Sequence, residues 1–333
     1  MKRSSKIVFL VLALALAAGL GFAVFKVQQQ ADREVIENAG ASEHADHSNQ
    51  YLTYQDVKYP VLRNMTSLLL IGTDNFVDDA KQPERDDLYW NRNLNDFNVI
   101  LVFDHDKKTV TPFQINRDTI TTVPWLTINH MIGGYYYAHF CYAHTYGSGK
   151  NDSCENVVTT ARMLLHDAPI DYYFSFTMDA VPVVNDMVGG VDVTLEEDLP
   201  ALGEEYVKGA TIHLEGNDAL RFVRHRRKDI VNANYYRMLR HRQYLTGFLE
   251  AAHISLEKNS DLFMNIYKRI DPYLCTNLTV NTMSDLVNDM MEYEILPVVS
   301  PDGEYVQGPE YFEFYPDEQS LWDCVYQAFC RKT

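Results

Sequence analysis

The segment that most limits the folding of this chain is an unbroken run of 19 uncharged apolar residues, from residue 7 to residue 25. As a helix rising about 1.5 Å per residue it spans roughly 28 Å, close to the hydrocarbon thickness of a bilayer. Lys2, Arg3 and Lys6 precede the run, and Lys26 follows it. A cleaved signal peptide usually has a shorter apolar core. We therefore interpret residues 1–26 as a cytoplasmic stub and a transmembrane anchor, with a removed signal peptide as the alternative.

The charges on the two sides of this run predict its orientation. Residues 31–47 carry five acidic residues and a single cation, Arg33. Because cations collect on the cytoplasmic side of a membrane, the N-terminus should be cytoplasmic and the chain beyond residue 26 extracellular. Residues 27–60 are polar, which is typical of an extracellular stalk. We expect the two histidines in this stretch, His44 and His47, to be solvated and without function.

Charge and cysteine content narrow the classes of function. The formal net charge is -17, from 29 Lys+Arg against 46 Asp+Glu. This argues against general affinity for nucleic acid, because binding a phosphate backbone requires a basic surface. The five cysteines suit an oxidising exterior. Cys141 and Cys154 bracket a stretch rich in Gly, Ser and Asn, so a disulfide between them and buried free thiols are both open.

Beyond residue 61 the sequence alternates between short apolar runs and segments of helical periodicity. The apolar runs predict strands at 67–72, 97–103, 109–115, 171–176 and 191–195. The periodic segments predict helices at 151–168, 178–190, 217–228 and 234–258. Strands that alternate with helices indicate an α/β domain whose sheet is covered on both faces.

A cluster of arginines is the first candidate for a binding site. Eight of the 29 cations lie between residues 221 and 242, and seven of them are arginine, whose planar fork binds phosphate through paired hydrogen bonds. Arg224 and Arg226 lie on different faces of an ideal helix, so the helix should end near His225 if both reach one ligand. Arg237 and Arg240 are three residues apart and share a face. The cluster indicates an oxyanion site, although a solvated basic helix face would have the same composition.

Three carboxylates at predicted strand ends are the second candidate. Asp74 follows the first strand, Asp96 immediately precedes the second, and Asp118 follows the third beside Arg117. If these strands are neighbours in one sheet, GTD at 72–74 and NRD at 116–118 can face one crevice at their carboxyl ends, where open α/β sheets bind ligands. Mg²⁺ typically binds one or two carboxylates together with phosphates and water. Each Asp taken alone is also common in turns.

Five collinear segments give the chain a family resemblance. They are GTD at 72–74, INRDT at 115–119, IDYYFSF at 170–176, GGVDVTL at 189–195, and LEGNDALRFVRHR at 214–226 followed by RMLRHRQYL. In this order and at these spacings they resemble the LytR-CpsA-Psr domain over about residues 66–250. An N-terminal membrane anchor and a short stalk also match that family.

The resemblance implies both a fold and an activity. The fold is a three-layer α/β/α sandwich with a central mixed sheet, as a catalytic domain at 61–255 followed by a partly helical extension at 256–333. The activity is that of a single-pass membrane phosphotransferase, which moves a glycopolymer phosphate from a polyprenyl-pyrophosphate carrier to a peptidoglycan hydroxyl with Mg²⁺, without nucleic acid. A pyrophosphatase or phosphodiesterase acting on the same lipid is an alternative, and so is a non-catalytic module that binds anionic polymers.

The resemblance also assigns roles to residues by their motif positions. Asp74 and Asp96 would hold the metal, and Arg117 and Asp118 would be catalytic, with Asp118 orienting Arg117 or acting as a base. The pyrophosphate would be bound by Arg117, Arg224, Arg226, Arg237 and Arg240. The chain departs from the family where Arg-Ser-Asp-Thr is expected and residues 94–97 read LNDF, so Arg92 or Arg85 would have to replace the missing arginine. It departs again at Asn234, where the family tends to have Asp.

Overall fold

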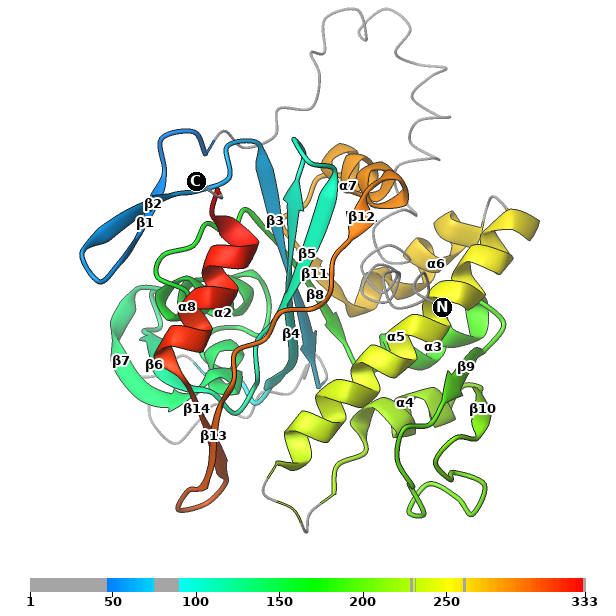
Figure 1. Ribbon diagram of the computed structural model, residues 1–333. Coiled ribbons are helices and arrows are strands. Elements are labelled where there is room, and N and C mark those ends of the chain that lie inside the picture. The colour runs from blue at the N-terminus through cyan, green and yellow to red at the C-terminus, as the bar shows by residue number, and fades with distance from the viewer. Residues whose placement is uncertain (1–46, 75–89, 228–229, 231, 260–261, 332–333) are drawn as a thin grey trace, which may run out of the picture.

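A six-stranded mixed sheet forms the centre of the molecule (Figure 1). The computed structural model describes residues 47–74, 90–227, 230, 232–259 and 262–331. In spatial order the strands are β11 (Leu274–Thr276), β8 (Tyr172–Thr177), β3 (Met65–Thr73), β4 (Asn95–Asp104), β5 (Thr109–Gln114) and β12 (Glu294–Ile295). β3 runs parallel to β8 and antiparallel to β4, which in turn runs antiparallel to β5. The mixed sheet and its four central strands were therefore predicted correctly.

Helices cover both faces of this sheet, which completes three layers (Figure 1). One face carries α3 (Ala180–Met187), α4 (Asn217–Arg224), α5 (Ala233–Lys258), α6 (Leu262–Ile270) and α7 (Val280–Glu292), and the other carries α2 (Asn151–Leu164) and α8 (Glu318–Phe329). All nine residues of β3 are buried. Leu68 and Leu70 pack into one hydrophobic cluster, while Leu69 and Ile71 pack into the other. Burial on both faces explains why the central strands are continuous apolar runs rather than alternating patterns.

In the described part of the chain, four hairpins and two short 3-10 helices surround the three layers. The hairpins are β1 (Tyr51–Tyr54) with β2 (Val57–Pro60), β6 (Ile120–Leu126) with β7 (Ile132–His139), β9 (Val191–Thr194) with β10 (Thr211–Leu214), and β13 (Gly303–Gln307) with β14 (Phe312–Pro316). The 3-10 helices are η3 (Phe140–Thr145) and η4 (Asp271–Tyr273).

The predicted stalk is wrong for its described part, residues 47–60. The β1–β2 hairpin packs against α8, where the ring of Tyr54 stacks on Trp322 with centroids 4.6 Å apart. His47, expected to be solvated, is 4% exposed, and its Nε2 lies 3.2 Å from Asp171 Oδ1. Alternating burial along β1 supplies the apolar face that holds the hairpin to the domain. Residues 27–46 and His44 lie outside the described residues.

The predicted boundary at residue 255 is also wrong, because it cuts through α5 and the sheet continues beyond it. β11 forms one edge of the sheet beside β8, and β12 forms the other edge beside β5. These strands have only three and two residues, too few for an alternating pattern to be recognised. The described residues between 256 and 331 therefore belong to the same folded body as the preceding ones.

The membrane anchor predicted from the apolar run stays a prediction. Within the described ranges, no helix is long and apolar enough to cross a bilayer. Residues 7–25 lie outside those ranges.

Candidate functional site

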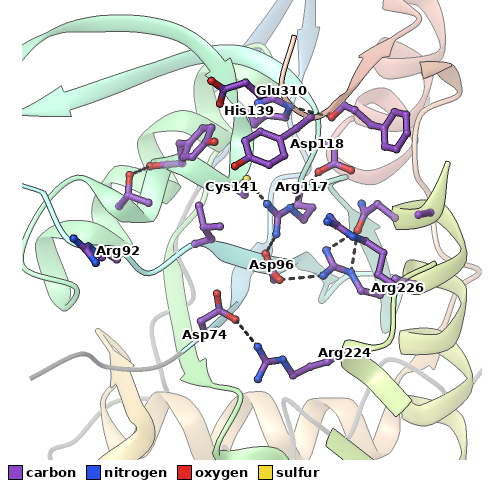
Figure 2. Close-up of a pocket in the computed structure, with 18 of the residues that line it drawn as sticks. Asp74, Arg92, Asp96, Arg117, Asp118, His139, Cys141, Arg224, Arg226 and Glu310 are labelled. Atoms are coloured by element: carbon purple, nitrogen blue, oxygen red, sulfur yellow. Dashed lines mark hydrogen bonds and ion pairs between the residues drawn. The ribbon is translucent and has the colours of Figure 1, made fainter. Parts of the chain in front are cut away.

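A polar cavity of about 710 Å³ opens at the end of the sheet where β3 and β5 finish and β4 begins (Figure 2). Its lining includes ten acidic or basic side chains from distant parts of the chain. These are Arg92, Arg117, Arg224, Arg226, Arg227, Arg237, Asp74, Asp96, Asp118 and Glu310. Among the described residues that line it, six guanidinium groups against four carboxylates give an excess of positive charge in a chain of net charge -17. Such a local excess favours an anionic ligand.

The sheet brings the predicted acidic residues together as expected. Thr73, the last residue of β3, pairs with Asn95 at the start of β4, so Asp74 and Asp96 emerge at the same edge. β5 ends at Gln114, and the following turn carries Arg117 and Asp118 into the same cavity. Gly72 permits the close approach of β3 and β4 here, because a Cβ on it would lie 2.8 Å from the Cβ of Phe97.

Asp96 sits between two buried arginines. Its Oδ1 pairs with Arg117 Nη1, and its Oδ2 accepts a hydrogen bond of 3.0 Å from Arg237 Nη1. Arg117 Nε lies 3.2 Å from Asp118 Oδ1, and its Nη2 donates to Cys141 Sγ at 3.0 Å. The Arg117 and Arg237 side chains are only 13% and 7% exposed. Both guanidinium groups are therefore fixed in place before any ligand binds.

Two asparagines hold Arg237 from behind. Asn234 Oδ1 accepts from Arg237 Nε at 3.1 Å and from its Nη2 at 2.7 Å. The amide nitrogen of Asn234 then donates to Asn116 Oδ1 at 2.6 Å, and that oxygen also accepts from the Asp118 backbone N–H at 3.0 Å. Because a carboxylate accepts but does not donate, an ionised Asp at position 234 would lose the link to Asn116. The departure from the family pattern thus has a structural reason.

The buried groups differ in how strongly their environment favours charge. Burial and the nearby Arg117 lower the pKa of Arg237 to about 9. Burial opposes charge on Arg117 too, but Cys141 and Asp118 raise the pKa of Arg117 above its ordinary value. Burial raises the pKa of the Cys141 thiol even though Arg117 opposes that shift. At neutral pH both arginines are therefore cations, while Cys141 is a neutral thiol.

The other cavity arginines are more exposed than this pair. α4 ends at Arg224, and His225 adopts an extended conformation with ψ 131°. The helix predicted from periodicity to residue 228 is therefore too long. Its end before His225 is the one expected if Arg224 and Arg226 reach one ligand, and both arginines line the same cavity. Arg224 Nη2 lies 3.5 Å from Asp74 Oδ1, with both side chains more than a third exposed. Of the two arginines considered as replacements for the family arginine, Arg92 also lines the cavity, whereas Arg85 lies outside the described residues.

The prediction that Arg240 binds the ligand in this cavity is wrong. Its side chain is 0% exposed and does not line the cavity. Arg240 Nη1 pairs with Glu197, and its Nη2 donates to the backbone oxygen of His225. Helical spacing placed Arg240 near Arg237, but two residues three apart differ by about 60° around the helix. That angle turns Arg240 toward the loop after β9 instead of the cavity.

The predicted metal ligands both line the cavity but differ in accessibility. Both oxygens of Asp96 interact with arginines. Asp74 is 38% exposed, and its Oδ1 lies 3.5 Å from Arg224 Nη2. Among the described residues, no group of three or more His, Cys, Asp and Glu side chains is arranged to hold a metal. A cation here would therefore need oxygen ligands from its substrate, as Mg²⁺ commonly has.

The cysteines are free thiols, so the disulfide considered between Cys141 and Cys154 is not present. Cys141 accepts the hydrogen bond from Arg117, whereas Cys154 Sγ lies 3.8 Å from His144 Nε2. Cys141 is a site residue that the sequence did not reveal, because nothing in its neighbourhood indicates contact with Arg117.

His144 supports the segment that leads into Asp96. It is fully buried, its Nδ1 lies 3.1 Å from the Asn93 backbone oxygen, and its backbone N–H donates to Asn95 Oδ1 at 3.0 Å. Burial lowers the pKa of His144 to about 4. The folded chain therefore holds this imidazole neutral at a pH where the unfolded chain protonates it.

This difference predicts how stability depends on pH. Between about pH 6.5 and pH 4 the unfolded state binds a proton at His144 and the folded state does not, so acidification through this window should weaken folding. Between these pH values the wild-type protein should lose roughly 3 kcal/mol of its free energy of unfolding because of His144, and His144→Gln should abolish this part of the loss. Urea unfolding at pH 7 and pH 4.5 measures it. His241, also buried and neutral with a pKa lowered to about 3, leaves a remaining slope in the variant. If the free energy of unfolding of His144→Gln depended on pH as strongly as that of the wild type, His144 would not be the group that takes up the proton.

The sequence matches a known protein family over most of its length. A sequence model of the LytR_cpsA_psr family matches residues 24–320. The chain belongs to the LytR-CpsA-Psr family. Its relatives include a protein of Bacillus cereus (strain AH820) named polyisoprenyl-teichoic acid--peptidoglycan teichoic acid transferase TagU, 29% identical over 222 residues. That match covers 66% of this chain and 63% of the relative, so less than two thirds of the relative's length is represented. TagV of Bacillus subtilis (strain 168) is 24% identical, over 72% of this chain and 55% of TagV.

Solved structures agree with the LytR-CpsA-Psr fold. TagT bound to LIIa-WTA superposes with a TM-score of 0.57 at 21% identity, covering 79% of this chain and 89% of that chain. The crystal structure of B. subtilis TagU gives a TM-score of 0.53 at 21% identity, covering 81% and 98%. These likenesses show the fold.

The structure brings together seven of the eight site residues that we predicted for this LytR-CpsA-Psr chain. Asp74, Asp96, Arg117, Asp118, Arg224, Arg226 and Arg237 line one cavity, and Arg240 alone among the predicted residues does not. The supporting roles of Asn116 and Asn234 had a weak signal, since Asn116 lies inside the INRDT motif. The cavity-lining aromatic residues Tyr142 and Tyr311 had none.

Proposed function

We propose that this protein is a phosphotransferase that moves a glycopolymer phosphate from a polyprenyl-pyrophosphate carrier to a hydroxyl of peptidoglycan. The observation that carries the proposal is the meeting of six arginines in one cavity, two of them buried and fixed by Asp96. The relative named as a teichoic acid transferase supports this reaction class. So does the similar structure of TagT bound to LIIa-WTA.

In the proposed reaction the arginines neutralise the diphosphate. The acceptor hydroxyl oxygen forms a bond to the phosphorus that carries the glycan, and the bond from that phosphorus to the bridging oxygen breaks. The electron pair leaves with the polyprenyl monophosphate. Arg117 stabilises the charge on the phosphoryl oxygens, and Asp118, 3.2 Å from it in the same cavity, receives the hydroxyl proton. Phosphoryl transfer depends chiefly on such positioning and electrostatics.

Mg²⁺ is part of the proposal because the donors fit it. Asp74 and Asp96 offer hard carboxylate oxygens beside the place for a diphosphate, a set that Mg²⁺ accepts when phosphates complete its shell. Asp74 would be the main protein ligand because it is the more accessible of the two. When bound, the ion would add positive charge at the diphosphate.

Replacing Asp74 by Asn should therefore raise the Mg²⁺ concentration needed for half-maximal transfer by about tenfold, because the neutral amide is a weaker ligand. Initial rates over a Mg²⁺ series measure this, with calorimetry of Mg²⁺ binding in the presence of polyprenyl diphosphate. Asp218→Asn is the control, since Asp218 is exposed and pairs with Arg221 away from the cavity. An unchanged Mg²⁺ dependence in the Asp74 variant would remove Asp74 from the metal site.

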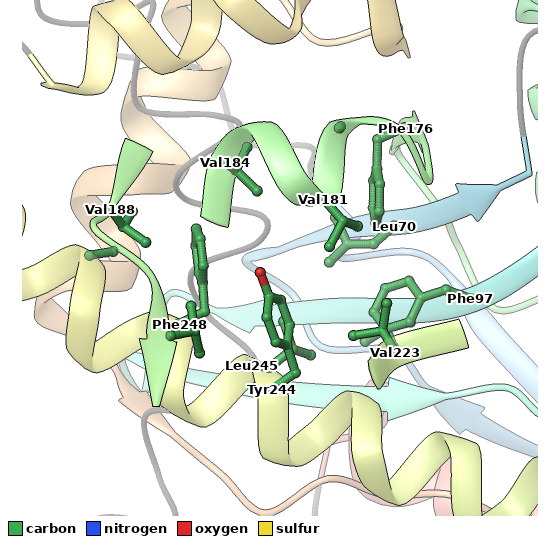
Figure 3. Packing of buried hydrophobic residues seen from close by; sticks show 14 of the residues in the cluster. Leu70, Phe97, Phe176, Val181, Val184, Val188, Val223, Tyr244, Leu245 and Phe248 are labelled. Atoms are coloured by element: carbon green, nitrogen blue, oxygen red, sulfur yellow. The ribbon is translucent and has the colours of Figure 1, made fainter. Parts of the chain in front are cut away.

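The polyprenyl chain requires an apolar space, which we propose lies between the sheet and helices α3 to α5. This layer is filled by side chains such as Phe97, Val181, Tyr244 and Leu245 (Figure 3). The gap among them is about 30 Å³, too small for an isoprenoid chain. Binding of the carrier therefore requires the helices to separate from the sheet.

The location of the protein follows from the same proposal. We propose that residues 7–25 anchor it in the cell membrane in a single pass, with the N-terminus cytoplasmic and the cavity outside. The apolar run and its flanking cations support this orientation. The cavity would then meet both a lipid carrier and the cell wall.

The test is a transfer assay with the full-length protein in detergent micelles. It receives a polyprenyl-pyrophosphate oligosaccharide and peptidoglycan oligomers, with and without Mg²⁺. We expect an oligosaccharide joined to peptidoglycan through a phosphodiester. Release of free oligosaccharide phosphate alone would identify a hydrolase instead. If the protein bound the carrier but formed no product, it would be a non-catalytic module that binds the polymer.

A further inference from the structure

The β6–β7 hairpin presents aromatic rings to solvent. Alternation along β7 directs Ala138 and, on the paired strand, Val123 toward the core. The opposite face carries Tyr135 and Tyr137, which are 57% and 72% exposed, and ends at His139. Two large exposed rings at alternate positions on one strand are a feature that the proposed chemistry in the arginine cavity does not use.

The inner face of this hairpin fixes the position of those rings. The Trp125 indole lies against Gly133, where a Cβ would come within 2.1 Å of it. Tyr136 is itself 39% exposed, and its ring lies between Trp125, with centroids 6.4 Å away, and Tyr146, with centroids 6.1 Å away. The outer rings are therefore presented on a supported strand, and little conformational entropy is lost when a ligand stacks on them.

The aromatic face is continuous with the arginine cavity. His139 Nε2 lies 3.0 Å from the Phe312 backbone oxygen, and its ring contacts Tyr142 and Tyr311 with centroids 5.7 and 6.3 Å away. His139, Tyr142 and Tyr311 all line the cavity, and Tyr311 is 55% exposed. Figure 2 shows His139 and Glu310 at the end of the cavity opposite Asp74 and Arg224. A ligand lying along β7 would thus reach Arg117 from the end away from Arg224.

The charges around this face select among ligands. The chain contains no Lys or Arg between Arg117 and Lys150. The neighbouring β13–β14 hairpin and its turn contribute the acidic Glu304, Glu310 and Glu313. Anionic lipid headgroups and anionic polymers are repelled by such a surface. A neutral glycan is not repelled, and its pyranose rings can stack on tyrosines while carboxylates and phenols bond its hydroxyls and amides.

We propose that the face formed by Tyr135, Tyr137, His139 and Tyr311 is the docking track for the acceptor, a neutral N-acetylated glycan strand of peptidoglycan. The proposal rests on the proposed transferase function and adds an entry path for the acceptor. The diphosphate occupies the arginine side of the cavity, and the glycan strand approaches from the aromatic side. The two substrates then meet at Arg117 and Asp118.

Binding measurements test the track directly. The full-length protein in micelles is titrated with a β-1,4-linked N-acetylglucosamine hexasaccharide and with undecorated peptidoglycan oligomers. Tyr135→Ala combined with Tyr137→Ala should weaken binding of both probes about tenfold, the effect of losing two stacking contacts. The Tyr135→Phe and Tyr137→Phe pair keeps the rings and should stay within about threefold of wild type. Tyr51→Ala, a similarly exposed ring on β1, is the control and should bind normally. Normal binding by the double alanine variant would overturn the track.

Kinetics separate this proposal from the transferase function. The double alanine variant should raise KM for the peptidoglycan acceptor about tenfold and leave kcat and the affinity for polyprenyl diphosphate unchanged. If the wild-type protein transferred polymer but bound neither glycan, the aromatic face would not be the acceptor site, and the transferase function would still stand. If glycan binding depended on these rings but no polymer were transferred, the glycan site would stand and the transferase function would be wrong.

A membrane contact is the competing outcome for this face. In vesicles of brominated phosphatidylglycerol, the reconstituted wild-type and double alanine proteins should show equal quenching of tryptophan fluorescence. Weaker quenching in the variant, together with unchanged glycan binding, would assign the face to the bilayer and overturn the proposal.

Discussion

Arg117→Ala should lower kcat/KM for polymer transfer by at least about 10³-fold. Arg117 is the guanidinium at the centre of the cavity, in contact with Asp96, Asp118 and Cys141 at once. Its loss removes a fixed donor from the phosphoryl oxygens, and such donors act most strongly where charge develops in the transition state. The rate of formation of wall-linked product measures the effect. Arg117→Lys keeps the charge but not the planar fork, so it should recover only a small part of the activity.

The matched control for this prediction is Arg221→Ala. Arg221 belongs to the same arginine cluster in sequence, but it is 53% exposed, pairs with Asp218 and does not line the cavity. Its loss should change the transfer rate by less than about twofold, as expected for an exposed ion pair. Thermal unfolding of both variants establishes that the proteins are folded. A folded Arg117→Ala protein with near-normal transfer would remove Arg117 from the chemistry.

Much of the site could be predicted because it depends on strand ends. A continuous apolar run marks a strand buried on both faces, and its last residue marks the sheet edge. The pairing of Thr73 with Asn95 brings Asp74 and Asp96 together, as the family resemblance implied. The end of α4 at Arg224 was predictable for a related reason, since Arg224 and Arg226 reach one cavity only if the helix stops between them.

The remaining features depend on contacts between residues far apart in sequence. The side-chain amide of Asn116 donates a hydrogen bond to the hydroxyl of Tyr305, 189 positions away in the sequence. Tyr311 reaches the cavity because β14 lies beside the start of β6. No local pattern records such contacts. The stalk prediction failed for the same reason, because the polar composition of residues 47–60 hides the few rings, such as Tyr54, that hold the hairpin to α8. The composition of residues 47–60 alone could not show that the hairpin is buried, because its burial depends on the surface of α8 against which it packs.

Arg240 was predicted from the sequence to bind the ligand, but in the structure it forms a buried ion pair with Glu197. Mutations can test which of these two roles is correct. Glu197→Ala should lower the free energy of unfolding by about 3–5 kcal/mol, since it leaves the fully buried guanidinium without its acidic partner. For a domain of this size the midpoint temperature should fall by roughly 10 °C. Calorimetry or urea unfolding at pH 7 measures the change. The neighbouring Glu196→Ala is the control, and it should be neutral because Glu196 is exposed.

The same pair of variants separates the two roles of Arg240. A structural role predicts that Glu197→Ala, once folded at low temperature, still binds polyprenyl diphosphate with nearly normal affinity, because Arg240 does not line the cavity. It also predicts that adding Arg240→Met to Glu197→Ala restores much of the lost stability, since an apolar side chain of similar length leaves no buried charge. If instead stability were normal in Glu197→Ala and diphosphate binding were lost on adding Arg240→Met, Arg240 would be a ligand that turns toward the cavity when the carrier binds.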